Sequence, residues 1–217
     1  MRLIDLPPSK SLANRTLVAL AVAGKPLPEP EDSWSDDMRA MHRVLRGHGD
    51  AGAAGTAFRF GMAYWAAQAG QSIHLNGTPR LLERPIDGLV KALADLGADL
   101  ERKSDGSWKI NGKALRGGAL SIDATVSSQF VSALHLVEPC MAAPLELTLE
   151  GEPVSAPYIE MTKRVKQDME WPVEADWSAG IVWALRASCL GESICLQGLG
   201  RRSIQGDALW SRWGLPL

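Results

Sequence analysis

The chain has 217 residues, of which 46% are hydrophobic and 22% are charged, and its formal net charge is −2. These values are typical of a globular protein and exclude a chain that is disordered or membrane-embedded throughout. A net charge so near zero creates no general field for nucleic acid or acidic lipid, so we expect neither as a partner. Any anion site must be made locally, from Lys, Arg and backbone N–H groups.

The N-terminal segment and the cysteines indicate the compartment. Prolines directly follow Met1–Leu6, which is too short for the apolar region of a signal peptide, and the apolar run Leu17–Gly24 is too short to span a membrane. The 3 cysteines, Cys140, Cys189 and Cys195, form no CxxC pair and have no histidine at metal-ligand spacing. We interpret them as reduced core thiols of a soluble, cytoplasmic protein without a metal.

The predicted helices are of two kinds, which alternate along the chain. Helices of the first kind open with small or hydroxyl residues and are apolar on nearly every side, which is typical of buried helices. They are Ser11–Ala23, Gly55–Ala67, Ser127–Val137 and Ser178–Leu190. Helices of the second kind open with acidic residues, proline or both, and are amphipathic. They are Asp36–Leu45, Pro85–Leu96, Pro157–Met169 and Gln205–Trp213.

The alternation indicates an internal repeat. Helices of one kind recur at intervals of about 45 to 50 residues, with one longer interval of about 72. Strands are predicted between them at Ile73–Leu75, Trp108–Ile110, Ala119–Ile122 and Leu145–Leu149. The pattern favours an α/β repeat, and an ordinary doubly wound α/β domain is the alternative. Gly52–Gly55 is too short for a dinucleotide fingerprint, so we expect no nucleotide cofactor.

The segment Pro8–Arg15 is the clearest candidate for a ligand site. A helix N-terminus carries unpaired N–H donors and the positive end of the helix dipole. Lys10 adds a charge, Ser11 a hydroxyl, and Arg15 a planar guanidinium on the same face one turn later. A serine cap with two solvated cations is the alternative, but the apolar helix that follows favours an anion site.

Other predicted buried helices begin similarly. A threonine hydroxyl and backbone N–H groups follow Gly55, and the third buried helix begins with Ser127, Ser128 and Gln129. The fourth begins at the carboxylate of Asp176 instead. A single start of this type is only a cap, whereas three starts without an acid indicate a shared surface that binds a polyanion.

Two further loops place polar groups beside helix starts. Arg80 follows a turn and is placed to reach a ligand, whereas we expect Arg84 and Glu83 to form a structural ion pair. Ser155 and Tyr158 lie in a similar loop, and a core position for Tyr158 fits the sequence as well as a ligand contact does. The 4 histidines lack the spacing of a catalytic triad or a zinc motif.

Several blocks of the chain, in this order, resemble the 5-enolpyruvylshikimate-3-phosphate synthase family, also called the 3-phosphoshikimate 1-carboxyvinyltransferases. The blocks are Pro8–Arg15, Ala54–Arg59, Pro79–Ile86, Ser127–Gln129, Val154–Ile159, Glu174–Ala179 and Ser203–Asp207. The resemblance implies an α/β fold of repeated βαβαββ units, with buried parallel helices and the sheets outside. It implies no cofactor.

The resemblance also implies a reaction and a set of substrate-binding residues. The family transfers the carboxyvinyl group of phosphoenolpyruvate to the 5-hydroxyl of shikimate 3-phosphate, releasing phosphate, in the shikimate pathway to aromatic amino acids. By likeness, Lys10, Ser11 and Arg15 bind shikimate 3-phosphate, and Lys10 also contacts phosphoenolpyruvate. Arg80 and the Gly55 loop are expected to bind the phosphate of phosphoenolpyruvate. The rest of the expected shikimate 3-phosphate pocket is Ser127, Ser128, Gln129, Ser155 and Tyr158.

The same resemblance predicts the domain organisation. We expect residues 7–172 to form a first domain, whose third repeat is shortened because only Lys163–Pro172 lies where the family has further strands. Residues 173–217, with residues 1–6, are expected to begin an incomplete second domain. The family's catalytic Asp is expected beyond Leu217, so we assign no catalytic residue and expect negligible turnover by the chain alone.

Two alternatives to an active transferase stay open. The chain could be a non-catalytic domain or fragment that binds shikimate 3-phosphate and needs a C-terminal half for chemistry. Its role could also be structural only, with incomplete repeats that self-associate through open sheet edges and apolar surface. A titration with shikimate 3-phosphate separates these two alternatives, because only a formed pocket binds it.

Overall fold

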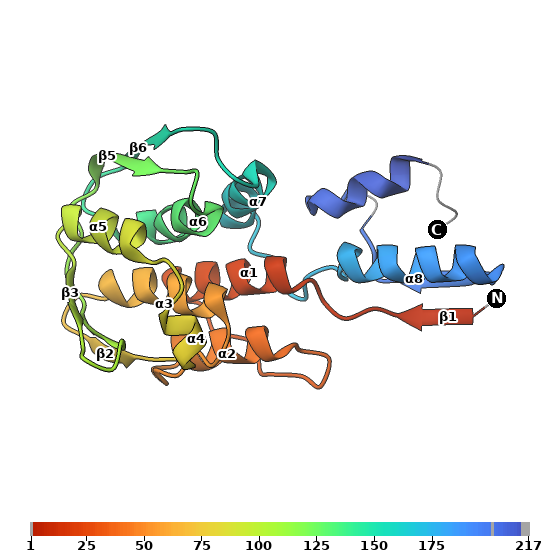
Figure 1. Ribbon diagram of the computed structural model, residues 1–217, viewed down its shortest axis with the longest axis horizontal. Helices are drawn as coiled ribbons and strands as arrows, with labels where there is room; N and C mark the ends of the chain where they lie inside the picture. The colour runs from red at the N-terminus through yellow and green to blue at the C-terminus, as the bar shows by residue number, and fades with distance from the viewer. Residues whose placement is uncertain (1, 201, 214–217) are drawn as a thin grey trace.

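The structure is a computed structural model that describes residues 2–200 and 202–213. Its elements form two lobes of unequal size, which lie side by side in Figure 1. The large lobe contains the elements from α1 (Lys10–Val22) to α7 (Ala156–Gln167). The small lobe contains β1 (Arg2–Asp5), α8 (Trp177–Leu190), β7 (Ile194–Gln197) and the 3-10 helix η2 (Gly206–Trp213).

Three core helices occupy the centre of the large lobe. They are α1, α3 (Gly55–Ala66) and α6 (Ser128–Val137), and each contacts the other two. Their sequences are apolar on nearly every side, so no side of them is suited to solvent. The side chains of Phe60 on α3 and Phe130 on α6 are fully buried among them.

Amphipathic helices close the grooves between the core helices. Helix α2 (Asp36–Leu45) packs against α1 and α3, α5 (Asp87–Asp95) against α3 and α6, and α7 against α6 and α1. The arrangement is therefore cyclic. The start of α2 has a typical cap, because the Ser35 hydroxyl accepts a hydrogen bond from the Met38 N–H at 3.4 Å.

The strands of the large lobe lie outside these helices (Figure 1). Strand β4 (Trp108–Asn111) is the centre of an antiparallel sheet, with β2 (Ser72–Leu75) and β3 (Asp99–Arg102) on its two sides. Strands β5 (Gly118–Asp123) and β6 (Leu145–Glu150) pair in parallel, as β1 and β7 do in the small lobe. Alternate residues of β2, such as Ile73 and Leu75, point to the core.

Some elements differ from the prediction. Strands β1, β3 and β7, the short helix α4 (Pro79–Leu82) and the 3-10 turn η1 (Glu138–Cys140) were not predicted. Strand β3 reads Asp-Leu-Glu-Arg and is mostly exposed, so it lacks the apolar alternation that marks a strand. Helix α5 begins at Asp87 rather than at Pro85. The last predicted helix is a 3-10 helix, whose first turn is closed by a hydrogen bond from Ala208 N–H to Gln205 O at 3.1 Å.

Two expectations about burial are wrong. Helix α8 was predicted to be buried, but Val182 on it is 67% exposed, and Leu185 and Leu190 are exposed as well. Its main described neighbours, β7 and η2, leave one side of it uncovered. The cysteines are free, but Cys189 is exposed and so is not a core thiol. Among the described helices, none has the length and apolar character needed to cross a bilayer.

Candidate functional site

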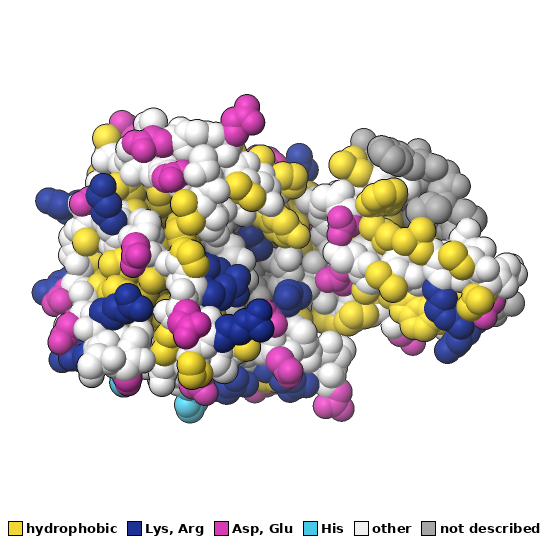
Figure 2. Space-filling model, in the orientation of Figure 1, with side chains coloured by type: hydrophobic (Ala, Val, Ile, Leu, Met, Phe, Trp, Pro, Cys, Tyr) yellow, Lys and Arg dark blue, Asp and Glu magenta, His cyan; other side chains and the backbone are white. Residues whose placement is uncertain are grey.

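A cavity of about 580 Å³ lies where the large lobe faces the small lobe, and we call it the main cavity. Figure 2 shows Lys and Arg side chains gathered on this part of the large lobe, whereas apolar side chains spread over the small lobe. The lining residues are Lys10, Ser11, Asn14, Arg15, Thr56, Val126, Ser127, Ser128, Gln129, Val154, Ser155, Tyr158, Asp176 and Ser178. All the predicted binding residues are therefore brought together at this cavity, except Gly55 and Arg80.

The guanidinium of Arg15 is the most deeply buried cation of the cavity. Arg15 is only 3% exposed, and its Nε donates to Thr162 Oγ1 at 2.8 Å while Nη1 donates to the Ser11 carbonyl at 2.9 Å. Burial lowers the pKa of Arg15 to about 10, although the nearby Tyr158 phenol opposes the change. These hydrogen-bond partners are neutral, so the positive charge is not compensated by a described carboxylate. A buried charge in that state is favourable only if an anion joins it.

Lys10 stands at the rim of the same cavity. Its Nζ lies 3.6 Å from an Asp37 carboxylate oxygen, and both side chains are partly exposed. A pair of this kind is weak in water, so it leaves the lysine available to a stronger anionic partner.

A second cationic cluster forms at the start of α3. A Cβ added to Gly55 would lie 2.6 Å from Nη1 of Arg84 and 3.2 Å from Nη1 of Arg59. Arg59 is buried, donating to Gln129 Oε1 at 2.8 Å and to the Pro85 carbonyl at 3.1 Å. Burial, followed by the charge of Arg84, lowers the pKa of Arg59 to about 10. Two positive charges at a helix N-terminus are an arrangement suited to an anion.

This geometry changes the expectation for the two arginines near α4. The predicted ion pair between Glu83 and Arg84 is wrong, because it is not among the ion pairs of the described residues and Arg84 faces Arg59 instead. Arg80 is exposed on α4 and does not line the main cavity. Its role stays a prediction.

Hydroxyl groups complete the opposite wall. Ser127 caps α6 by accepting a hydrogen bond from the Gln129 N–H at 3.2 Å, and Ser128 follows on the cavity side. Ser155 is the non-glycine residue with a left-handed backbone in the described chain, at φ 62°, and such strain is typical of functional loops. Tyr158 is 40% exposed and lines the cavity, so it is not a core tyrosine.

Sequence reasoning missed Asn14 and Arg59 as site residues, and it assigned Arg84 to an ion pair instead of the site. The Asn14 side chain is 1% exposed, and its Oδ1 has no described hydrogen-bond partner. A spacing rule could have found two of these residues. Arg59 follows Gly55 by four residues, as Arg15 follows Ser11, and Asn14 lies one turn after Lys10.

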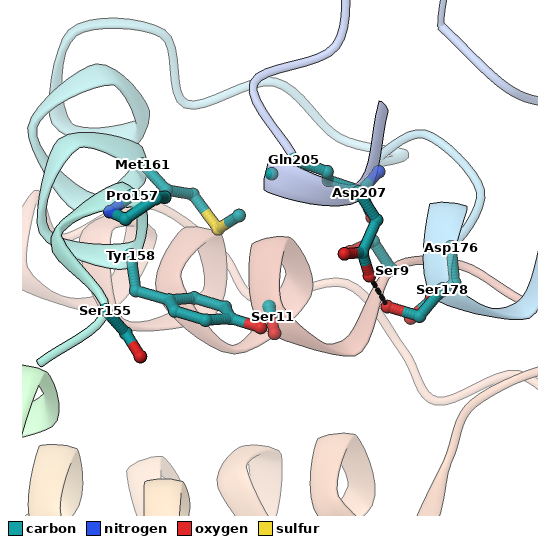
Figure 3. A pocket seen from close by; sticks show the side chains of 11 residues that line it. Ser9, Ser11, Ser155, Pro157, Tyr158, Met161, Asp176, Ser178, Gln205 and Asp207 are labelled. Carbon is teal, nitrogen blue, oxygen red and sulfur yellow. Dashed lines mark hydrogen bonds between the residues drawn. The ribbon is translucent and has the colours of Figure 1, made fainter. Parts of the chain in front are cut away.

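A smaller cavity of about 200 Å³ adjoins the main cavity on the side of the small lobe (Figure 3). It shares Ser11, Tyr158 and Asp176 with the main cavity. Ser178 donates a hydrogen bond to the carboxylate of Asp207 on its small-lobe wall. We call it the inter-lobe cavity.

The fold and the main cavity define a class of protein: an α/β protein whose core helices begin at a cavity lined by the buried cation Arg15. The sequence model of the EPSP synthase family, described as 3-phosphoshikimate 1-carboxyvinyltransferase, matches residues 48–175. The chain belongs to this family.

Individual relatives match more of the chain than the family model does. Relatives named 3-phosphoshikimate 1-carboxyvinyltransferase are 35% identical over 235 residues in Bacteroides fragilis and 33% over 260 residues in Colwellia psychrerythraea. Each match covers 94% of this chain but only 57% or 61% of the relative. EPSP synthase from Acinetobacter baumannii has a similar fold, with a TM-score of 0.57 at 18% identity over 73% of this chain and 42% of that chain. The predicted family and α/β fold class are confirmed.

Proposed function

We propose that the main cavity binds shikimate 3-phosphate and phosphoenolpyruvate, and that the whole protein transfers the carboxyvinyl group between them and releases phosphate. The observation that carries this proposal is the burial of Arg15 and Arg59 without a carboxylate partner among the described residues. Both substrates carry a phosphate and a carboxylate, so together they supply the anions that two such cations need.

The two cationic clusters suit different parts of the substrate pair. We place the phosphate of phosphoenolpyruvate at the start of α3, between Gly55 and Arg84, where a side chain on Gly55 would collide with the guanidinium. We place shikimate 3-phosphate between Arg15 and the hydroxyls of Ser127 and Ser128. These residues bind and orient the reactants, and we assign no catalytic residue among them.

The two lobes support the proposed domain division into residues 7–172 and residues 173–217 with 1–6. The chain crosses between the lobes twice, and the two crossings lie side by side. Ser9 N–H donates to the Glu174 carbonyl at 2.9 Å, and Asp176 N–H donates to the Pro7 carbonyl at 2.9 Å. The cytoplasmic location and the self-association of incomplete repeats stay predictions. Exposed apolar residues of the small lobe, such as Val182, are what self-association would cover.

Calorimetric titration with shikimate 3-phosphate tests the proposal. We expect the parent chain to bind and Arg15→Lys to bind at least tenfold more weakly, because lysine keeps the charge but loses the planar fork. The matched control is Arg164→Lys on α7, which is exposed beside Glu160 and should bind like the parent. Absence of binding by the folded parent chain would overturn the proposal.

A further inference from the structure

We propose that the inter-lobe cavity is a hydroxyl-binding subsite, in which Asp207 and Ser9 hold neighbouring hydroxyl groups of the ligand whose anionic groups lie in the main cavity. This inference rests on the proposed function and adds to it. It assigns the orientation of a polyhydroxylated ring, with its charged end toward the large lobe and its hydroxyls toward the small lobe.

The hydroxyl of Ser9 is the first reason. Ser9 occupies the N-cap position of α1 and is only 1% exposed, yet its side chain makes no cap hydrogen bond and its Oγ has no described partner. The side chains of Ser35, Ser127 and Asp176 do cap their helices. The Ser9 hydroxyl therefore does not serve the fold, and a buried hydroxyl without a partner is costly unless a ligand supplies one.

The charge of the inter-lobe cavity is the second reason. Asp207 lines this cavity and not the main cavity, while Asp176 stands at the boundary of both, and neither has an ion pair with a described residue. Two carboxylates repel a phosphate or a carboxylate, so the anionic end of a ligand is excluded from this cavity. They accept strongly from hydroxyls, since O–H to carboxylate hydrogen bonds are short and charge-assisted. Neutral hydroxyl donors fit both the carboxylates and the Ser9 oxygen.

The position of Asp207 is fixed by its neighbours. Gln205 is buried, and its Nε2 donates to Glu174 Oε1 and to the Ala175 carbonyl, both at 2.9 Å. Its Oε1 accepts from the Trp177 N–H at 3.1 Å. These contacts attach the start of η2 to the start of α8. Figure 3 shows the Asp207 carboxylate on the small-lobe wall of the cavity, across from Tyr158.

The first test compares two ligands on the variant Asp207→Asn. If Asp207 accepts from ligand hydroxyls, the variant binds shikimate 3-phosphate about tenfold more weakly. Inorganic phosphate has no carbon-borne hydroxyl, so its affinity stays the same or rises by up to about threefold as a negative charge is removed. The control is Asp95→Asn, the same change of charge at an exposed position on α5. Equal changes for both ligands would overturn the subsite.

The second test uses Ser9→Ala and separates binding from folding. The variant removes a buried hydroxyl without a described partner, so its Tm stays the same or rises by about 2 °C, while shikimate 3-phosphate binds several-fold more weakly. A lower Tm with unchanged affinity would overturn the proposal. So would heat from magnesium or potassium chloride alone that disappears in Asp207→Asn, because the cavity would then be a cation site. Failure of the parent chain to bind shikimate 3-phosphate would instead overturn the proposed function.

Discussion

The core helices of the large lobe and helix α8 of the small lobe have similar apolar sequences but different surroundings. Helix α1 buries Leu17 and Val18 completely, because α2, α3, α6 and α7 all contact it. Helix α8 buries Trp177 and small residues such as Gly180, Ala184 and Ala187, while Val182 and Leu185 face outward. An apolar helix sequence therefore favours burial, but the elements that pack against the helix determine whether it is buried.

The same substitution at a valine of α1 and at a valine of α8 tests the difference in burial between these two helices. Val18→Asp places a carboxylate in the core, where Val18 is 0% exposed, and we expect a loss of more than about 4 kcal/mol, enough to unfold many domains. Val182→Asp should change the free energy of unfolding by less than about 0.5 kcal/mol. Urea unfolding of both variants measures the difference. Equal losses would contradict the assignment of α8 as an uncovered helix.

The next largest expected effect is on phosphoenolpyruvate binding, and it tests whether Arg84 of the cationic cluster in the large lobe is a ligand. Arg84→Ala should weaken the binding of phosphoenolpyruvate at least tenfold, because the guanidinium faces Arg59 at the start of α3. Arg80→Ala is the matched control and should weaken it less than about twofold, because Arg80 is exposed on α4 and, unlike Arg84, is not among the nearest neighbours of a Cβ at Gly55. Calorimetry measures both, and the opposite order of effects would restore Arg80 as the ligand.

The smallest effect concerns ion pairs in the two lobes. Burial alone would raise the pKa of Glu138, but the hydrogen bond and charge of Lys166, at 2.6 Å, lower it below its usual value. The pair therefore stabilises the fold above the usual pKa of a glutamate, and its contribution is lost as the pH falls through the lowered pKa. Glu138→Gln should cost about 1 kcal/mol at pH 7, and the cost should shrink as the pH falls below the usual pKa of a glutamate and through the lowered pKa of Glu138.

The small lobe offers the control for that variant. Glu192 pairs with Arg186, and both side chains are about two fifths exposed. Glu192→Gln should cost less than about 0.5 kcal/mol across this pH range, as exposed pairs usually do. A pH-independent cost for Glu138→Gln, measured by urea unfolding, would contradict the role of Lys166.

The sequence predicted the helices well because their signals are local. The apolar stretch after Ser11 and the acidic start at Asp36 each mark a helix without knowledge of its neighbours. Strand β3 was not predicted, because it is stabilised by pairing with β4 and its own sequence lacks a strand pattern. The exposure of α8 was not predicted either, because it depends on which elements pack against this helix.

The candidate site was predictable in part. Residues that follow helix starts, such as Lys10 and Ser127, could be found because a helix N-terminus has a sequence signature. Arg84 could not be distinguished from Arg80, because only the fold brings Pro85 and its neighbours against Arg59. Sequence patterns could not predict that the side-chain oxygens of Ser9 and Asn14 are buried without a described hydrogen-bond partner, because this depends on tertiary packing.

A crystal structure of the chain soaked with shikimate 3-phosphate and phosphoenolpyruvate tests the proposed positions of both substrates. We expect an anionic group of shikimate 3-phosphate to lie within hydrogen-bond distance of Arg15 or of the Ser127 and Ser128 hydroxyls. We also expect the phosphate of phosphoenolpyruvate to lie beside Arg84 at the start of α3. Ordered ligands bound elsewhere, with the Arg15 guanidinium still hydrogen-bonded only to Ser11, Ser132 and Thr162, would contradict these positions.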